Sequence, residues 1–178
     1  LSGFLTDAWD LLIRGVHDKR APARHPTIAT VAEDGRPEMR TVVLRGADRT
    51  AATVEVHSDT RTAKVRALMA HPHAALHVWS ARHHLQLRLA LRVEILTGEA
   101  IADRWKKVPP GARVAYGTEP APGSPIDTSL DYAKPADPDR FAALVGHVTE
   151  IDVLHLGQDH RRALFAAQTD WRGTWLAP

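Results

Sequence analysis

The chain has 178 residues, of which 44% are hydrophobic and 25% are charged, with a formal net charge of +2. This composition is typical of a globular protein and argues against disorder as its main state. The chain has no cysteine, which excludes disulfides and thiolate chemistry and is compatible with a reducing cytoplasm, where we expect the protein to act. No apolar run approaches the roughly 20 residues of a membrane span, and no signal peptide is visible. The small net charge gives little support to a nucleic-acid partner.

The first part of the chain predicts a helix and then an antiparallel meander. Apolar residues recur at helical spacing over residues 4–18, and the prolines of segment 21–26 end this helix. The pair Asp34-Gly35 is typical of a hairpin turn. Three strands are predicted, at 27–32, 37–44 and 52–58. Their connections are too short for parallel pairing, so we expect an antiparallel sheet.

A second helix and two more strands follow. The helix is predicted at 61–70 and the first strand at 74–79. Residues 85–95 alternate apolar and polar side chains without a break. A long strand with one apolar face is typical of a closed or nearly closed barrel. The polar face of this strand, which carries Gln86, is available for a ligand or a second subunit.

The remainder of the chain mixes short helices with closing strands. Helices are predicted at 100–108 and 139–145, and the proline- and glycine-rich stretch 117–138 predicts a long loop, which is usually functional or mobile. Further strands are expected at 148–156, 162–168 and 171–176. We expect one domain over residues 1–178, with an N-terminal helix (1–20), main barrel strands (27–100), helices and the long loop (101–145) and closing strands (147–178).

Cations gather around the two strands of segment 40–64. Arg40 and Arg45 flank the apolar centre of the first strand, and Arg61, Thr62 and Lys64 open the helix that follows the second. A helix N-terminus offers unpaired N–H groups to an anion, while Arg adds a bidentate fork and Lys a point charge. The segment therefore predicts a phosphate site.

Four groups of residues resemble the pyridoxamine 5′-phosphate oxidase-like, FMN-binding split-barrel family. They are Arg40-Thr-Val-Val-Leu-Arg45, His57-Ser58-Asp59, Thr62-Ala-Lys64 and Gln86. The order of elements is similar to that of the family from about residue 27 to residue 176, and the ending Trp175-Leu-Ala-Pro178 is also similar. The resemblance implies a mainly β fold with peripheral helices, namely a six-stranded antiparallel split β-barrel that binds FMN as a homodimer.

The resemblance also implies roles for individual residues. Arg40, Thr62 and Lys64 match residues that bind the FMN phosphate, with Arg61 as a stand-in for a second phosphate arginine whose place is taken by Ala63. The remaining flavin contacts are expected from the backbone of Thr41, Val42 and Val43, from the pair His57 and Ser58, and from Gln86, which reaches the flavin of the other subunit. Arg45 stands where the oxidase has a lysine that faces the substrate phosphate, and we add Arg113 as a second candidate for an anionic substrate. No catalytic acid or base is assigned.

The sequence departs from the oxidase in the region that binds its substrate. Residues 105–113 keep no copy of the Tyr, Arg and Ser that hold the substrate phosphate, and the C-terminal Arg-x-His pattern is reduced to residues 160–163. We therefore predict an FMN-dependent oxidoreductase that uses an unidentified small molecule or NAD(P)H. A flavin-binding carrier or sensor without turnover stays open, as do a true pyridoxamine phosphate oxidase and replacement of FMN by heme or a deazaflavin.

Other site classes have less support in the sequence. The paired histidines at 71–73 and 83–84 lack an HExxH pattern or clustered carboxylates, so no metal site is predicted. The chain also lacks GxGxxG, GxxxxGK[ST] and GxSxG, which gives no support to a Rossmann site, a P-loop or a serine hydrolase. A barrel that binds single-stranded nucleic acid is disfavoured because no basic stripe carries interspersed aromatics.

Overall fold

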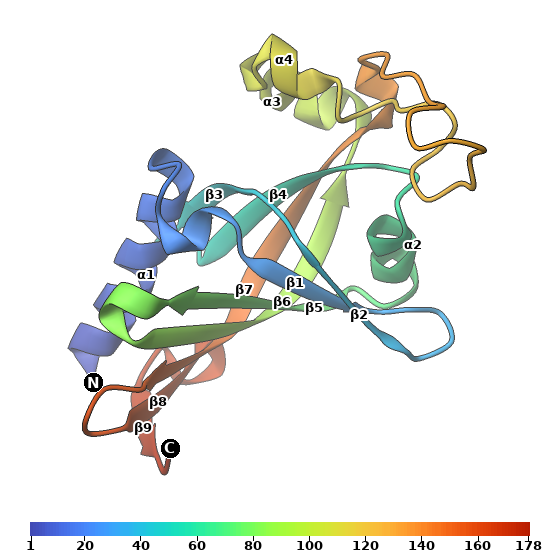
Figure 1. Ribbon diagram of the computed structural model, residues 1–178. Coiled ribbons are helices and arrows are strands. Elements are labelled where there is room, and N and C mark those ends of the chain that lie inside the picture. Colours follow the sequence, from blue (N-terminus) through green and yellow to red (C-terminus); the bar gives the residue numbers. More distant parts are fainter.

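The computed structural model describes all 178 residues and consists mainly of one antiparallel sheet (Figure 1). The first half contains α1 (Ser2–His17), β1 (Thr27–Val31), β2 (Pro37–Thr41), β3 (Leu44–Asp48), β4 (Thr53–Asp59), α2 (Ala63–Ala70), β5 (His73–Ser80) and β6 (Leu85–Leu96). The second half contains α3 (Ala102–Lys107), α4 (Pro110–Arg113), β7 (Phe141–His155), β8 (Arg161–Ala166) and β9 (Gly173–Leu176). Short 3₁₀ turns lie at Pro22–Arg24, Ala81–His83, Gly98–Ile101, Pro138–Arg140 and Ala167–Thr169.

The strand order shows why the sheet curls into a barrel. The hydrogen-bonded path is β2-β1-β5-β6-β7-β4-β3, and β8 and β9 extend the sheet from the far half of β7. The two ends of this path, β2 and β3, are consecutive in the chain and are joined only by Val42 and Val43. A link of two residues cannot cross a flat sheet of seven strands, because adjacent strands lie about 4.8 Å apart. The two edges must therefore meet at this corner, and the barrel stays split between them.

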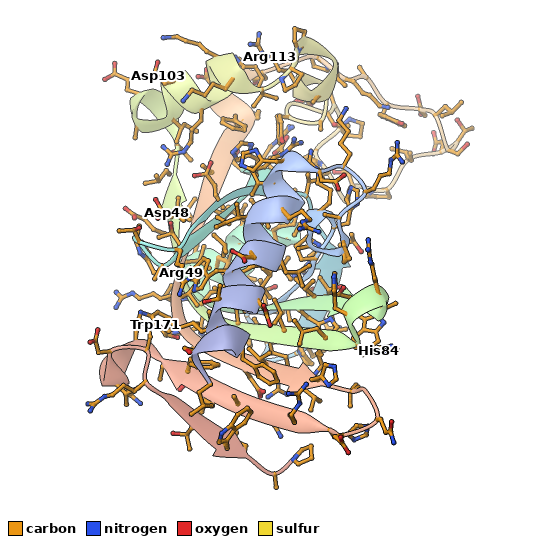
Figure 2. All side chains as sticks on the ribbon, turned by 90° about the vertical axis from the view of Figure 1, so that its left-hand side faces the viewer. Asp48, Arg49, His84, Asp103, Arg113 and Trp171 are labelled. Atoms are coloured by element: carbon orange, nitrogen blue, oxygen red, sulfur yellow. The ribbon has the colours of Figure 1, made fainter.

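The barrel interior is filled by aliphatic side chains from alternate positions of the strands. Leu85, Leu87, Leu89 and Leu91 of β6 are all buried, whereas Arg88 and Arg92 between them are exposed. Helix α1 lies across one side of the barrel (Figure 2), and its Trp9 and Leu12 are buried in the main core. Burial at 20 to 30 cal/mol per Å² of apolar surface makes this interior the main source of stability.

A second, smaller cluster lies where β7 leaves the barrel. Ile101, Val108, Tyr116, Phe141 and Ala143 are buried together, and Trp105 packs against them. This cluster holds α3 and α4 over the outer face of β4 and β7, at the top of the view in Figure 1. The long connection from Gly117 to Asp137 leaves from the same cluster and is pinched by a bridge between Glu119 and Ala133. None of the helices is both long and apolar enough to cross a lipid bilayer.

The mainly β, antiparallel split-barrel fold is confirmed, and the whole sheet has nine strands. Two details of the predicted elements were wrong. The expected strand 37–44 is interrupted at Val42 and Val43, and β3 extends to Asp48, into the segment between the expected strands 37–44 and 52–58. The expected helix 139–145 is a 3₁₀ turn followed by the start of β7. Phe141 to Leu144 are buried and all pair with β4, and Ala143 and Leu144 pair with β6 as well. This pairing outweighs the helix-start signal of Asp137.

Candidate functional site

The predicted phosphate-binding residues come together where the end of β4, the start of α2 and β2 meet. Lys64, in the first turn of α2, donates from Nζ to Ser58 Oγ at the end of β4, at 3.2 Å. Ser58 Oγ also lies 2.9 Å from Oγ1 of Thr62, which is the residue that precedes α2. Arg40 on β2 faces the same region, because its cross-strand partner Ile28 points into the barrel core. The structure thus unites two cations and two hydroxyls from three separate elements.

The electrostatics of this group suit an anion. The pKa of Lys64 is lowered by burial and then by the like charge of Arg40, with Asp59 opposing both effects. Lys64 has no carboxylate ion-pair partner, and the N–H groups of Ala63 and Lys64 at the start of α2 donate to no protein acceptor. A dianionic phosphate would relieve the repulsion between the two cations, and its oxygens would accept hydrogen bonds from these free N–H groups. The donor set therefore fits the FMN phosphate.

Arg40 is oriented by two neighbours. Its Nη1 donates to Thr30 Oγ1 at 2.7 Å and to the Glu38 carbonyl at 3.2 Å. Its Nη2 donates to Glu38 Oε2 at 2.8 Å. Nε and the second proton of Nη2 remain free to donate to a ligand.

Arg61 has a different role from the one expected of it. Its Nε and Nη2 donate to the buried carboxylate of Asp59, its Nη1 donates to Glu119 Oε1 at 2.8 Å, and its Nη2 also donates to the Thr118 carbonyl. These partners raise the pKa of Arg61, Asp59 most of all, and commit the guanidinium to the protein. Arg61 therefore anchors the long loop beside the cluster that contains Lys64, instead of presenting its charge to a ligand.

A pocket separate from this cluster lies on the outer face of β3 and β4, under α3. Its volume is about 530 Å³, and its lining includes Arg45, Glu55, His57, Arg104 and Lys107. Arg45 is the extra residue of a β-bulge between Leu44 and Gly46, a feature that commonly re-aims a side chain next to a binding site. Neither Arg45 nor Lys107 has a carboxylate partner, so the pocket carries free positive charge.

Glu55 organises the polar wall of this pocket. It accepts from Arg104 Nε at 3.0 Å and from His57 Nε2 at 2.8 Å. Burial alone would raise the pKa of Glu55, but these hydrogen bonds outweigh it and hold the pKa below its ordinary value. The His57 ring packs edge-on against Phe141, and its Nδ1 is buried without a hydrogen-bond partner. An unpartnered ring nitrogen is costly to bury, so His57 carries a local penalty that no hydrogen bond offsets.

The other predicted residues divide between the site and its surroundings. The backbone of Thr41, Val42 and Val43 forms the corner between Arg40 on β2 and Arg45 on β3, which lines the pocket under α3. Arg113 lies on α4 in the outer layer, at the opposite end of the barrel from His84 and Trp171 (Figure 2), and donates to the carbonyls of Lys106 and Val108. Its guanidinium also stacks on Trp105. Arg113 therefore holds the turn between α3 and α4 and is absent from the pocket lining.

Gln86 lies on the outer face of β6, between Trp79 of β5 and Leu154 of β7. Its neighbours Leu85 and Leu87 point into the core, so Gln86 faces away from the barrel interior. Within one chain it cannot join Arg40 and Lys64. Sequence reasoning missed Arg104 and Lys107. Helical spacing predicted their helix, but only the packing of α3 brings Arg104 to Glu55 and Lys107 into the same pocket lining. No cluster of three or more His, Asp or Glu side chains is arranged to bind a metal.

Comparison with known proteins identifies the family. The family model described as "Pyridoxamine 5′-phosphate oxidase, FMN-binding domain" matches residues 6–97, which is just over half of the chain. The chain belongs to this family. FMN is therefore the cofactor of the domain, and the resemblance seen in the sequence is confirmed.

Two kinds of relative illustrate the match to the oxidase family. A pyridoxine/pyridoxamine 5′-phosphate oxidase of Mycolicibacterium paratuberculosis is 34% identical over 116 residues, which cover 62% of this chain and 52% of the relative. The corresponding Arabidopsis thaliana oxidase 2 is 23% identical over 93% of this chain and 91% of its own. The chain spans about half the length of the first curated relatives it matches.

Solved structures show the same fold over nearly the whole chain. A pyridoxamine 5′-phosphate oxidase-related, FMN-binding protein of Nostoc punctiforme is 25% identical, has a TM-score of 0.80, and covers all of this chain and 99% of its own. PhzG of Burkholderia lata, solved with tetrahydrophenazine-1-carboxylic acid, is 18% identical with a TM-score of 0.74 over 99% of this chain and 90% of its own. The second likeness establishes the fold alone.

Proposed function

We propose that this protein is an FMN-dependent oxidoreductase of the cytoplasm that works as a homodimer on a small anionic substrate. The observation that carries this proposal is the meeting of Arg40, Ser58, Thr62 and Lys64 in a chain of the FMN-binding family. The family match supplies the cofactor, and the clustered cations and hydroxyls support the proposal that its phosphate binds there.

In this proposal the chain supplies binding and orientation while the flavin supplies redox chemistry. The isoalloxazine ring of FMN accepts or donates two electrons. Arg40 and Lys64 would hold the phosphate, and the backbone from Thr41 to Val43 would run beside the ring. His57 would lie in the wall of the pocket beside the ligand, with its Nε2 held by Glu55.

The substrate class follows from the charge of the outer pocket. Arg45 and Lys107 are free cations, while the charge of Arg104 is balanced by Glu55. A carboxylate or phosphate on the substrate would find these cations at one end of the pocket. Pyridoxine 5′-phosphate, the substrate type named for the curated relatives, is one member of this class, and NAD(P)H is the other candidate partner for electron transfer.

A second copy of the chain would complete the site. Gln86 faces outward beside Trp79, whose side chain is exposed, and the same face carries a cavity of about 430 Å³ lined by His77, Arg88 and Leu164. Exposed aromatic and aliphatic side chains next to ordered ion pairs are common at protein interfaces. Pairing of two such faces would bring Gln86 toward the partner's flavin.

Flavin titration of two variants tests this proposal. FMN and riboflavin share the ring, and only FMN carries the phosphate. Lys64→Gln should weaken FMN binding at least tenfold and leave riboflavin binding unchanged, because it removes a charge-assisted contact to the phosphate. Lys107→Gln, in the other pocket, should leave both affinities unchanged. Equal losses for FMN in both variants, or no loss for Lys64→Gln, would refute the phosphate assignment.

A flavin-binding carrier without turnover is the second candidate function. The observation that favours it is the state of His57, whose Nε2 is tied to Glu55 and whose Nδ1 is inaccessible to solvent. Among the other titratable side chains of the lining, only the cations Arg45 and Lys107 lack an ion pair, so no carboxylate is left free to act as a base. Anaerobic mixing of the FMN-loaded protein with NADH, NADPH and pyridoxine 5′-phosphate separates the two functions, since saturable bleaching of the flavin excludes a carrier.

A further inference from the structure

The carboxylate of Glu38 shares the guanidinium that the phosphate site depends on. Glu38 and Arg40 lie two residues apart on β2, so both side chains project from the same face of the strand. Their ion pair is 2.8 Å long, and both side chains are largely shielded, with exposed fractions of 35% and 23%. A pair that is partly withdrawn from water is screened less than one on the open surface.

The geometry places any anion bound to Arg40 close to this carboxylate. Two groups that each accept a hydrogen bond from one guanidinium lie on the order of 5 Å apart. Arg61, the other cation beside Lys64, is neutralised by Asp59 and Glu119. The local charge is therefore two cations, Arg40 and Lys64, against Glu38 and a phosphate that itself carries close to two negative charges.

We propose that Glu38 acts as an internal counter-anion on Arg40, which weakens the grip on the FMN phosphate and makes the flavin an exchangeable ligand. This inference rests on the proposed phosphate site and adds to it a residue that tunes affinity. Thr30 has the opposite effect: its hydroxyl orients Arg40 at 2.7 Å without adding charge. Affinity is thus set by a balance between one orienting hydroxyl and one competing carboxylate.

Matched substitutions separate these two effects in the full chain. Glu38→Gln keeps an oxygen that can accept from Arg40 and removes the negative charge. From the Coulomb energy at this separation, it should tighten FMN binding by about tenfold and slow FMN dissociation to a similar extent. Riboflavin, which has no phosphate, should bind the variant and the wild type equally. Thr30→Val should instead weaken FMN binding.

The control is Glu33→Gln, which removes one negative charge from the exposed turn of the same hairpin without touching Arg40. It should change FMN affinity by less than twofold. The readouts are equilibrium titration by flavin fluorescence and stopped-flow dissociation, at low and at high salt. The difference in FMN affinity between Glu38→Gln and wild type should become smaller as the salt concentration rises.

The outcomes distinguish this inference from the proposed function. Wild-type protein that binds FMN no more tightly than riboflavin refutes the phosphate site itself. Wild-type protein that prefers FMN, with Glu38→Gln unchanged or weaker, leaves the phosphate site standing and overturns the counter-anion. A tightening that occurs equally for riboflavin also overturns it, because the effect would then not act on the phosphate.

Discussion

Replacing Asp59 with asparagine, which has nearly the same shape, should lower the free energy of unfolding strongly. Its carboxylate is almost fully buried and accepts four hydrogen bonds. Oδ1 accepts from Arg61 N at 2.9 Å and from Arg61 Nε at 3.1 Å, while Oδ2 accepts from Arg61 Nη2 at 2.8 Å and from Gly117 N at 2.9 Å. Asp59→Asn places an amide nitrogen against two of these donors, whichever way the amide turns.

The magnitude follows from what is lost. Two charge-assisted hydrogen bonds disappear and the half-buried Arg61 loses its main counter-charge, which together cost roughly 3 to 5 kcal/mol of unfolding free energy. For a chain of this length that corresponds to a fall of roughly 10 °C in Tm. Glu119→Gln is the matched control, because Glu119 pairs with the same guanidinium but is 56% exposed, and it should cost less than about 1 kcal/mol.

Urea unfolding followed by circular dichroism, from neutral to acidic pH, measures both variants. Hydrogen bonds from Arg61 and Gly117 outweigh burial and hold the pKa of Asp59 below its ordinary value. The stabilisation by Asp59 is therefore fully present above the ordinary aspartate pKa of about 3.9 and is lost as pH falls through the lower folded-state value. The difference in unfolding free energy between wild type and Asp59→Asn should stay constant at neutral pH and disappear only below about pH 4. Equal losses for Asp59→Asn and Glu119→Gln would refute this reasoning.

Three further substitutions test the packing and the proposed dimer. Gly15→Ala in α1 should destabilise the protein although alanine favours helices, because the new Cβ would lie 2.6 Å from the backbone of Ala23; Gly3→Ala, which meets nothing within 4 Å, should be neutral or stabilising in the same thermal melts. Phe141→Ala should cost about 3 to 5 kcal/mol in urea unfolding, since Phe141 is fully buried in the cluster under α3; a loss below about 1 kcal/mol would show that the cluster contributes little. Trp79→Glu should convert a dimer to monomers in analytical ultracentrifugation with an unchanged far-ultraviolet spectrum, whereas an unchanged dimer would place the interface elsewhere.

Alternation and turn chemistry made most of the strands predictable. The strict period of two over 85–95 and the Asp34-Gly35 turn each specify one local structure, and both are present. Residues 141–145 misled the prediction because a short, continuous apolar run fits a buried helix and a strand covered on both faces equally well. Only pairing with β4 and β6, which are distant in sequence, decides the outcome.

The candidate site was predictable where its residues are close in the chain. Ser58, Thr62 and Lys64 span seven residues, and a strand followed by a helix start brings them together locally. Arg61 was misjudged because its partners Thr118 and Glu119 lie in the distant loop. Arg104 was missed for the same reason, since its partner Glu55 is far away in sequence and side-chain identity alone does not show which arginines are already paired.

The corner at Val42 and Val43 also fixes which way the two flanking arginines point. Arg40 turns toward the cluster that contains Lys64 and Arg45 toward the outer pocket, with Leu44 packed in the core between them. Because side chains alternate along a strand, inserting one residue at this corner would exchange Leu44 and Arg45 between the two sides of the wall. The spacing of this short segment, more than its exact composition, is what natural variation should leave untouched.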